Sequence, residues 1–288
     1  MKLVRFGPLG EEVPGLIDAQ GRMRNAASVT QDYGPQFFAQ GGLSRLASVD
    51  PESLPLVEES VRLGPCIARP HKFLAIGLNY TDHAEEAGLP IPDEPLAFMK
   101  ATSCISGPND AVEKPAGSEK LDWEVEIALV IGQGGVDIPE EQAAEHIAGY
   151  CIVNDITDRG WQFDGPGQWT KGKSFDGFGP VGPYLVTPDT LGDPTNLDLW
   201  LDVDGVRRQT GTTSRMIFSF AQIIAHLSSR MRLEAGDLIT TGTPPGVGLG
   251  HKPPLFLSPG QTMTLGVSGL GEQTQTIKQD TSRQEAAQ

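Results

Sequence analysis

Three acidic residues alternate with apolar ones in the segment LDWEVEIALVI, residues 121–131. Because successive side chains of a strand point to opposite faces, we expect Asp122, Glu124 and Glu126 on one face. Carboxylates about 6.5 Å apart along a strand need either solvent or a shared cation. The acidic face continues with two apolar residues, which indicates that it enters a core. The pattern fits a solvated edge strand, but the apolar continuation favours a site for a hard divalent cation.

Composition limits what such a site could serve. A chain of 288 residues is long enough for one large domain with a small companion. With 22 basic and 37 acidic residues its formal net charge is -15, which argues against nucleic acid or an anionic membrane surface as a partner. Three cysteines form no CxxC pair, and neither a signal region nor a run of 18 apolar residues occurs. We therefore expect a cytoplasmic protein.

Short strand-like runs separated by Gly, Pro and Asp-Gly turns dominate the chain, and this pattern predicts an α+β fold rich in β-structure. We expect helices only after Pro139 and over residues 216–227. The chain divides into a small N-terminal β subdomain and linker (1–68), a main domain (69–278) and a flexible tail (279–288). The clearest strands are expected at residues 2–6, 15–18, 73–76, 96–99, 125–131, 149–153, 184–186, 197–203 and 237–241.

A histidine and a glutamate stand three residues apart after an apolar run, in the sequence GLNYTDHAEE. If this segment is helical, His83 and Glu86 face each other, and the carboxylate can orient the imidazole as a general base. A surface helix with ordinary charges would show the same pair. The spacing alone leaves both interpretations open.

Two later segments carry further charged candidates. Asp155 ends an apolar strand and could be a third metal ligand, and Arg159 could bind a substrate carboxylate in a bidentate manner. A structural salt bridge at a strand end explains the same residues. Lys173, beside glycine and aromatic residues, could be an electrostatic catalyst or a solvated loop lysine.

Other motifs carry no comparable signal. The glycine-rich segment 240–248 lacks the Lys-Ser/Thr of a phosphate-binding loop, so we do not expect nucleotide binding. The remaining histidines lack partner patterns, and we expect them to be structural or exposed: His71, His146, His226 and His251.

Taken in order over residues 70–270, these elements resemble the fumarylacetoacetate hydrolase superfamily. The matching motifs are GxNYxxHxxE at 77–86, PxxFxK at 95–100, ExE at 124–126, Asn-Asp with a following Arg and Gln at 154–162, GKSF at 172–175 and TGTP at 241–244. The resemblance implies a mixed β-sheet roll or barrel with a few flanking helices, in a protein that forms a homodimer.

The resemblance also implies residue roles. It assigns Glu124, Glu126 and Asp155 as ligands of Mg²⁺ or Mn²⁺, with Ca²⁺ as a further candidate. Asp122 matches no ligand, so we expect a supporting or solvent-facing acid there. The implied catalytic residues are His83, Glu86 and Lys173, and the implied substrate contacts are Tyr80, Lys100, Arg159, Gln162 and Thr243.

The activity implied is hydrolysis of a small anionic 2-keto acid. A 2,4-diketo acid, of the 2,4-diketo-3-deoxyfuconate or rhamnonate type, would give pyruvate and a second carboxylic acid. In this mechanism His83 activates water, Lys173 stabilises an oxyanion and the metal holds a pyruvate enolate. Rival activities on the same site are oxaloacetate decarboxylation and keto-enol or hydroxymuconate isomerisation. Ureidoglycolate lyase and a metal-stabilised binding protein rank lower.

Overall fold

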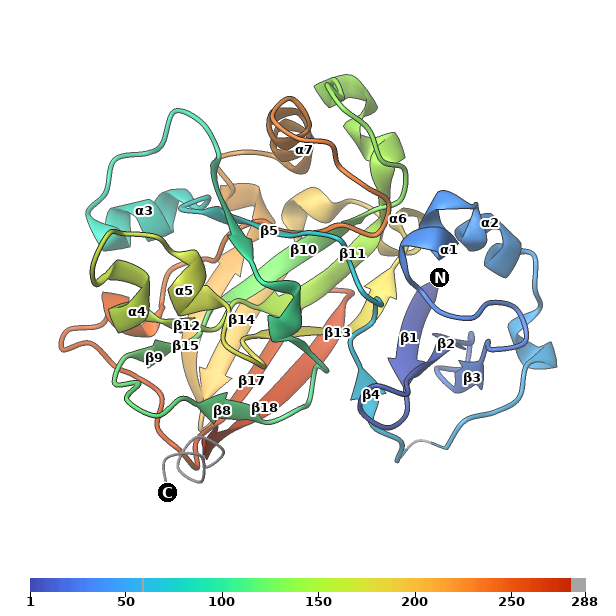
Figure 1. Ribbon diagram of the computed structural model, residues 1–288, viewed down its shortest axis with the longest axis horizontal. Coiled ribbons are helices and arrows are strands. Elements are labelled where there is room, and N and C mark those ends of the chain that lie inside the picture. The colour runs from blue at the N-terminus through green and yellow to red at the C-terminus, as the bar shows by residue number, and fades with distance from the viewer. Residues whose placement is uncertain (59, 281–288) are drawn as a thin grey trace.

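A large mixed sheet forms the centre of the molecule in the computed structural model, which describes residues 1–58 and 60–280 (Figure 1). The order of its main path is β3 (Met23–Asn25), β2 (Val13–Ile17), β1 (Lys2–Phe6), β13 (Gly179–Val186), β11 (Ile147–Asn154), β10 (Val125–Ile131), β16 (Leu238–Thr240), β5 (Phe73–Gly77) and β6 (Leu96–Lys100). Two short strands pair beside this path, β4 (Leu63–Gly64) on β1 and β7 (Ile105–Ser106) on β13.

A second sheet has five strands in the order β15 (Val206–Thr212), β14 (Asp198–Val203), β17 (Thr262–Val267), β18 (Gly271–Gln279) and β8 (Val112–Lys114). A two-stranded ribbon pairs β9 (Leu121–Asp122) with β12 (Thr157–Asp158). Parallel and antiparallel pairs both occur in the two larger sheets. The expected α+β, β-rich fold is confirmed.

The helices are short. The α-helices are α1 (Pro35–Ala39), α2 (Gly42–Ala47), α3 (Thr81–Ala87), α4 (Arg159–Phe163), α5 (Thr170–Lys173), α6 (Pro188–Leu191) and α7 (Phe220–Ser228). The 3-10 helices are η1 (Pro51–Ser53), η2 (Thr102–Cys104), η3 (Glu140–His146), η4 (Pro194–Asn196), η5 (Thr213–Arg215) and η6 (Gly248–Gly250).

The helix expected over 216–227 begins four residues later than the apolar pattern suggested. Ser219 is its N-cap: the Ser219 side chain accepts a hydrogen bond from the backbone N–H of Gln222, and the Gln222 side chain accepts one from Ser219. This capping box fixes the first turn, so the apolar residues before it lie outside the helix. The helix expected after Pro139 is a 3-10 helix.

The core lies on both faces of the central strands. All seven residues of β10 are buried. Strands β14 and β17 of the second sheet contact β10, and Phe220 of α7 packs its ring against Tyr150 of β11 at a centroid distance of 5.3 Å. In Figure 1, α7 lies above β11 and the strands β17 and β18 lie below it. A carboxylate on β10 is therefore enclosed by the fold.

The N-terminal segment extends the central sheet. Strand β1 pairs antiparallel with β13, with Lys2 opposite Val186 and Leu3 opposite Leu185. Figure 1 shows β1, β2 and β3 together with α1 and α2 at one end of the molecule. Residues 1–68 thus carry no separate sheet, and the boundary at residue 68 stays a prediction.

A buried ion pair holds the turn between β2 and β3. The side chain of Asp18 is 1% exposed and accepts hydrogen bonds from Arg24 Nε at 2.8 Å and Arg22 Nε at 2.9 Å. The backbone N–H groups of Gln20 and Arg22 donate to it as well. Burial opposes its ionisation, but these donors lower the pKa of Asp18 to about 2.

The expected flexible tail (279–288) lies mostly outside the described residues. Gln279 is the last residue of β18, and the N–H of Asp280 donates to the carbonyl of Lys114. Residues 281–288 are not among those described.

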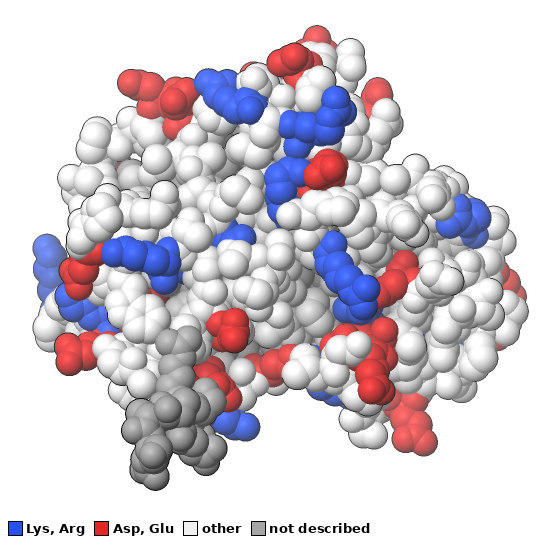
Figure 2. Space-filling view, viewed as in Figure 1, with Lys and Arg blue, Asp and Glu red and all other residues white. Residues whose placement is uncertain are grey.

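The surface adds little to the expectations drawn from composition. On the face shown in Figure 2, Lys and Arg are scattered among acidic and uncharged residues and do not form one basic band.

Cys66, Cys104 and Cys151 are buried and free. Among residues 1–58 and 60–280, no helix is long and apolar enough to span a bilayer.

Candidate active site

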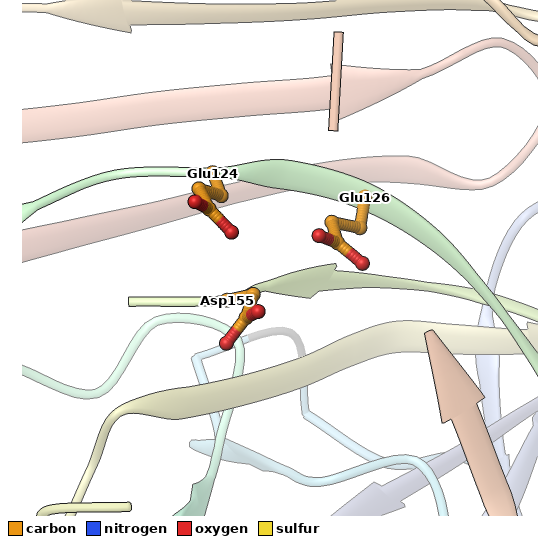
Figure 3. Close-up of side chains that lie close together, drawn as sticks. All are labelled: Glu124, Glu126 and Asp155. Atoms are coloured by element: carbon orange, nitrogen blue, oxygen red, sulfur yellow. The ribbon is translucent and has the colours of Figure 1, made fainter. Parts of the chain in front are cut away.

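Three carboxylates converge where β10 begins and β11 ends. Antiparallel pairing sets Val125 opposite Asn154, and the N–H of Asp155 donates to the carbonyl of Glu124 at 2.9 Å. Ligand oxygens of Glu124, Glu126 and Asp155 lie within 4.8 Å of one another. Figure 3 shows Glu124 and Glu126 projecting from the same stretch of chain to the side where Asp155 lies. The register of two strands thus assembles the cluster that the sequence predicted.

Asp122 does not join this cluster, because the acidic strand is interrupted at residues 123–124. Asp122 belongs to β9, and its fully buried carboxylate accepts from Arg159 Nε at 2.8 Å and from the N–H groups of Gly248 and Leu249 at 2.6 and 3.0 Å. It supports a loop and faces no solvent. The alternative of a solvated edge strand is wrong, since β10 pairs on both sides and is buried.

Three buried cations neutralise two of the carboxylates. Lys173 Nζ lies 2.7 Å from Glu124 Oε2 and 2.6 Å from Asp155 Oδ2. Arg159 Nη2 lies 2.6 Å from Glu124 Oε1, and Lys100 Nζ lies 2.5 Å from Asp155 Oδ1. Burial opposes the charge of Glu124, but Lys173 and Arg159 outweigh it and lower the pKa to about 2.

Glu126 has no cationic partner among the described residues. Its carboxylate accepts one hydrogen bond, from the N–H of Gly242 at 2.9 Å. Burial and the neighbouring charges of Asp155 and Glu124 raise the pKa of Glu126 well above its ordinary value. Four buried carboxylates, Asp122 included, therefore face three fixed cations.

The excess of negative charge and the type of ligand both favour a cation here. The three carboxylates supply only oxygen ligands, which Mg²⁺, Mn²⁺ and Ca²⁺ prefer, and Glu126 forms no ion pair with a Lys or Arg among the described residues. Glu124, Glu126 and Asp155 could hold such an ion together.

Close packing of α4 on α5 brings Lys173 and Gln162 together. A Cβ at Gly172 would lie 2.4 Å from the backbone N of Gln162, so only glycine permits this approach. The Gln162 carbonyl oxygen accepts from Arg159 Nη1 at 3.0 Å, and its amide nitrogen has no partner among the described residues. Two of the three donors of the Lys173 ammonium are used, which leaves one.

The predicted dyad forms on helix α3. His83 Nδ1 lies 3.0 Å from Glu86 Oε2, and Glu86 Oε1 accepts from the N–H of Gly246 at 2.9 Å. Burial opposes ionisation of Glu86, but the bonds to His83 and Gly246 lower its pKa. An ionised Glu86 that accepts from Nδ1 leaves His83 Nε2 free to act as a base.

Asn79 fixes the chain just before this helix. Its side-chain oxygen accepts from the N–H of Phe218 at 2.7 Å, and its amide nitrogen donates to the carbonyl of Thr241 at 2.8 Å. The helix that carries His83 is thereby tied to the strand end at Thr241, beside the Gly242 N–H that bonds Glu126. This network gives the dyad and the carboxylates a common frame.

One cavity of about 460 Å³ contains the dyad and the carboxylate cluster. The site residues that the sequence predicted and that line it are His83, Glu86, Glu124, Glu126, Asp155, Arg159, Gln162, Lys173 and Thr243. Residues separated by up to 160 positions in the sequence thus meet around one space.

The other predicted substrate contacts either lie outside the cavity lining or are already bonded to protein groups. Tyr80 and Lys100 are not among the lining residues; the Tyr80 hydroxyl is buried without a hydrogen-bond partner among the described residues. Thr243 lines the cavity, but its hydroxyl donates to the carbonyl of Val125 and accepts from Gln209. Arg159 already binds Asp122, Glu124 and Gln162. These contacts favour supporting roles, and the substrate contacts stay predictions.

Sequence reasoning missed several lining residues. His251, expected to be structural or exposed, lines the cavity with its Nε2 buried and without a hydrogen-bond partner among the described residues. Phe98, Trp169 and Leu249 also line it. They come from loops, the short 3-10 helix η6 and an edge strand, where no spacing rule marks a pocket wall.

Comparison with known proteins identifies the family of this chain. The model of the fumarylacetoacetate (FAA) hydrolase C-terminal family matches residues 72–278. A protein of Burkholderia ambifaria that carries only the provisional name of a hydrolase is 54% identical over 279 residues, which cover 96% of this chain and 99% of that protein.

Solved structures are similar over almost the whole chain. Fumarylacetoacetate hydrolase from Exiguobacterium antarcticum has a TM-score of 0.87 at 35% identity and covers 97% of this chain and 100% of its own. Maleylpyruvate hydrolase from Sphingobium sp. SYK-6, solved with manganese(II) and pyruvate, has a TM-score of 0.81 at 26% identity, with 97% and 99% covered. A 2-hydroxyhepta-2,4-diene-1,7-dioate isomerase from Mycobacterium marinum has a TM-score of 0.75 at 30% identity, with 98% and 100% covered.

Proposed function

Because this chain belongs to the fumarylacetoacetate hydrolase superfamily, we propose that it is a divalent-metal-dependent hydrolase that cleaves a carbon–carbon bond of a 2,4-diketo acid. The products are pyruvate and a second carboxylic acid. One observation carries the proposal: a single cavity contains both the His83–Glu86 pair and the three carboxylates. The manganese and pyruvate in the Sphingobium maleylpyruvate hydrolase support it.

The three carboxylates would hold the metal ion. A divalent cation such as Mg²⁺ or Mn²⁺ on Glu124, Glu126 and Asp155 would supply Lewis-acid stabilisation of the negative charge that develops at the 2-oxo end of the substrate. The raised pKa of Glu126 and its lack of a cationic partner support this assignment.

His83 is the general base. With Nδ1 bound to the Glu86 carboxylate, Nε2 takes a proton from a water molecule, and the hydroxide attacks the 4-carbonyl carbon. Glu86 stabilises the imidazolium that results. The bond from Gly246 to Glu86 keeps the pair oriented.

The remaining steps conserve atoms and charge. The C3–C4 bond breaks, C4 leaves as a carboxylic acid, and C3 keeps the electron pair as the enolate of pyruvate. The imidazolium of His83 returns its proton to C3, and the carboxylic acid ionises. The net reaction takes one water and one 2,4-diketo acid to two carboxylates and one proton.

Lys173 and Gln162 bind the substrate in this proposal. The third N–H of the Lys173 ammonium can donate to the oxyanion formed at C4, and the unpartnered amide of Gln162 can donate to the substrate carboxylate. Arg159 acts through Glu124 and Gln162 as a positioning residue.

Product analysis tests the proposal. The Mg²⁺-loaded protein is incubated with acylpyruvates, diketo-deoxy sugar acids, oxaloacetate, ureidoglycolate and hydroxymuconate-type substrates, and the products are identified by mass. Pyruvate with a matching carboxylic acid supports hydrolysis. Pyruvate with carbon dioxide would show decarboxylation instead. A product of the same mass as the substrate would show isomerisation instead. Full activity after removal of all divalent ions would overturn the metal assignment.

The setting of the enzyme is also a proposal. We propose a cytoplasmic homodimer acting on a small anionic substrate; three free buried cysteines are in line with the location, and the homodimer is what the sequence resemblance implies. Light scattering of the purified full chain gives its mass, and a monomer would contradict the dimer.

A further inference from the structure

The cavity has two unlike parts. Its inner part holds the charged cluster, whereas the outer part is largely apolar, with side chains that include Leu89, Phe98, Phe163, Trp169 and Leu249. The sequence resemblance implied a sugar acid, whose distal group carries several hydroxyls. The outer part therefore bears directly on the substrate.

A row of aromatic rings leads outward from the reacting end. Lys173 Nζ lies 5.3 Å from the centroid of the Phe98 ring. Phe98 and Trp169 have centroids 5.3 Å apart, and Trp169 and Phe163 have centroids 6.2 Å apart. Because Lys173 binds Glu124 and Asp155, the row begins at the proposed metal site and ends at Phe163, which is 48% exposed.

Trp169 is fixed in this row by its neighbours. A Cβ at Gly77 would lie 2.5 Å from Trp169 Cζ3, so the indole packs directly on the backbone where β5 ends. Trp169 is the N-cap of α5, the helix that carries Lys173, and Thr170 Oγ1 donates to the carbonyl of Met99 at 2.7 Å. Trp169 and Lys173 therefore lie on one short segment that contacts the ends of β5 and β6.

The outer part offers few partners for substrate hydroxyls. Leu249 and Val247 line the cavity from the loop that bonds Glu86 and Asp122. Among the described lining residues outside the dyad and the charged cluster, the side chains with hydrogen-bonding atoms are those of Thr243, Trp169, His251 and Lys252, and the Thr243 hydroxyl is already bonded to Val125 and Gln209. A hydroxyl that is buried without a hydrogen-bond partner disfavours binding, so a polyhydroxylated chain fits poorly.

We propose, resting on the function above, that the distal group of the substrate is a flat apolar acyl group: the substrate is an aroylpyruvate whose ring lies along Phe98 and Trp169. Hydrolysis gives an aromatic carboxylate, pyruvate and one proton. Phe98, Trp169 and Phe163 already pack edge to face on one another, and a further aromatic ring can pack on them in the same favourable way.

The test compares kcat/KM of the Mg²⁺-loaded enzyme for benzoylpyruvate, acetylpyruvate, maleylpyruvate and a 2,4-diketo-3-deoxy sugar acid. We expect benzoylpyruvate to exceed acetylpyruvate by roughly 10- to 100-fold, the range typical of apolar pockets. In Trp169→Ala this preference should fall about tenfold, while Trp161→Ala, on the neighbouring helix α4 and outside the cavity, should keep it. Equal rates, or a preference for the sugar acid, would overturn the inference. A preference for maleylpyruvate would also overturn it and would indicate that His251 or Lys252 binds a distal carboxylate.

A binding measurement separates this inference from the proposed hydrolysis. Phenylpyruvate lacks the 4-carbonyl and cannot be cleaved, and it shares its 2-oxo acid end with pyruvate, so the ratio of the two affinities reports on the aromatic wall. By calorimetry we expect it to bind at least tenfold more tightly than pyruvate to the wild type, and Phe163→Ala, which alters a half-exposed ring, should weaken it. If phenylpyruvate binds tightly but no diketo acid is cleaved, the proposed hydrolysis is wrong and the proposed aromatic binding site is supported. Equal affinities for both acids would overturn the wall.

Discussion

Asp18 and Glu126 are both buried carboxylates, but their surroundings differ in one respect. Asp18 has two arginines and two backbone N–H groups, and its pKa falls to about 2. Glu126 has one backbone N–H, two neighbouring carboxylates and a raised pKa. A buried acid with all its partners supplied by the chain is structural. A buried acid that lacks hydrogen-bond and ion-pair partners within the chain indicates a position where a ligand binds.

Among these variants, Glu126→Gln should lower activity the most without lowering the stability of the metal-free protein. Loss of a metal ligand should lower kcat/KM for a 2,4-diketo acid by at least about a thousandfold, a size typical of losing the main electrostatic stabilisation of a transition state. In metal-free protein the same change relieves repulsion from Glu124 and Asp155, so the unfolding midpoint should not fall. Kinetics and thermal unfolding measure the two effects. A marked loss of metal-free stability would break the contrast with Asp18.

His83→Ala should be the next largest effect. Removing a general base lowers kcat by about 10²- to 10⁴-fold. His146→Ala is the matched control, because His146 bonds the carbonyl of Gln133 and does not line the cavity. Full activity in His83→Ala would remove this mechanism.

Metal binding should stabilise the wild type and not Glu126→Gln. At a free Mg²⁺ concentration of 100 times Kd, binding to the folded state alone adds about 2.7 kcal/mol to the free energy of unfolding. Denaturant titrations with and without Mg²⁺ measure it. Asp18→Asn should keep the full response. An equal response in Glu126→Gln would place the ion elsewhere.

Asp18→Asn should have the smallest effect on activity. We expect kcat/KM of the folded enzyme to change by less than about twofold, a surface-like value for a residue that does not line the cavity, and the unfolding midpoint to fall. The depressed pKa sets the pH dependence. The stabilisation is complete above the ordinary pKa of 3.8 and is lost as pH falls through about 2, so wild type and variant should converge there. A difference that persists below pH 2 would contradict this origin.

The same contrast explains which site residues could be predicted from the sequence. Glu124, Glu126 and Asp155 could be found because strand register and motif order both point to them. Strand periodicity alone placed Asp122 with them, and only the resemblance set it apart, since the break at residues 123–124 depends on β9 pairing with β12, a contact distant in sequence.

The residues that line the cavity and the boundaries of the helices were harder to predict than the proposed metal ligands. The start of α7 is set by the Ser219 capping box and not by the apolar pattern that precedes it. Trp169 and His251 lie in loops, and their position depends on contacts with Gly77 and with the segment near Glu86. Strands β17 and β18 carry few apolar runs, because polar side chains such as Gln273 and Gln275 are buried in hydrogen bonds.

The pairing of β1 with β13 has a consequence during synthesis. The first strand leaves the ribosome early, yet one of its partners is centred on residues 185 and 186. At roughly 5–20 residues per second, that partner follows about 10–40 s later. Strand β2, only a few residues away, can cover the other edge of β1 at once. Over this interval the edge of the nascent strand thus stays open at Lys2 and Leu3, while β4 can cover Arg5 and Phe6.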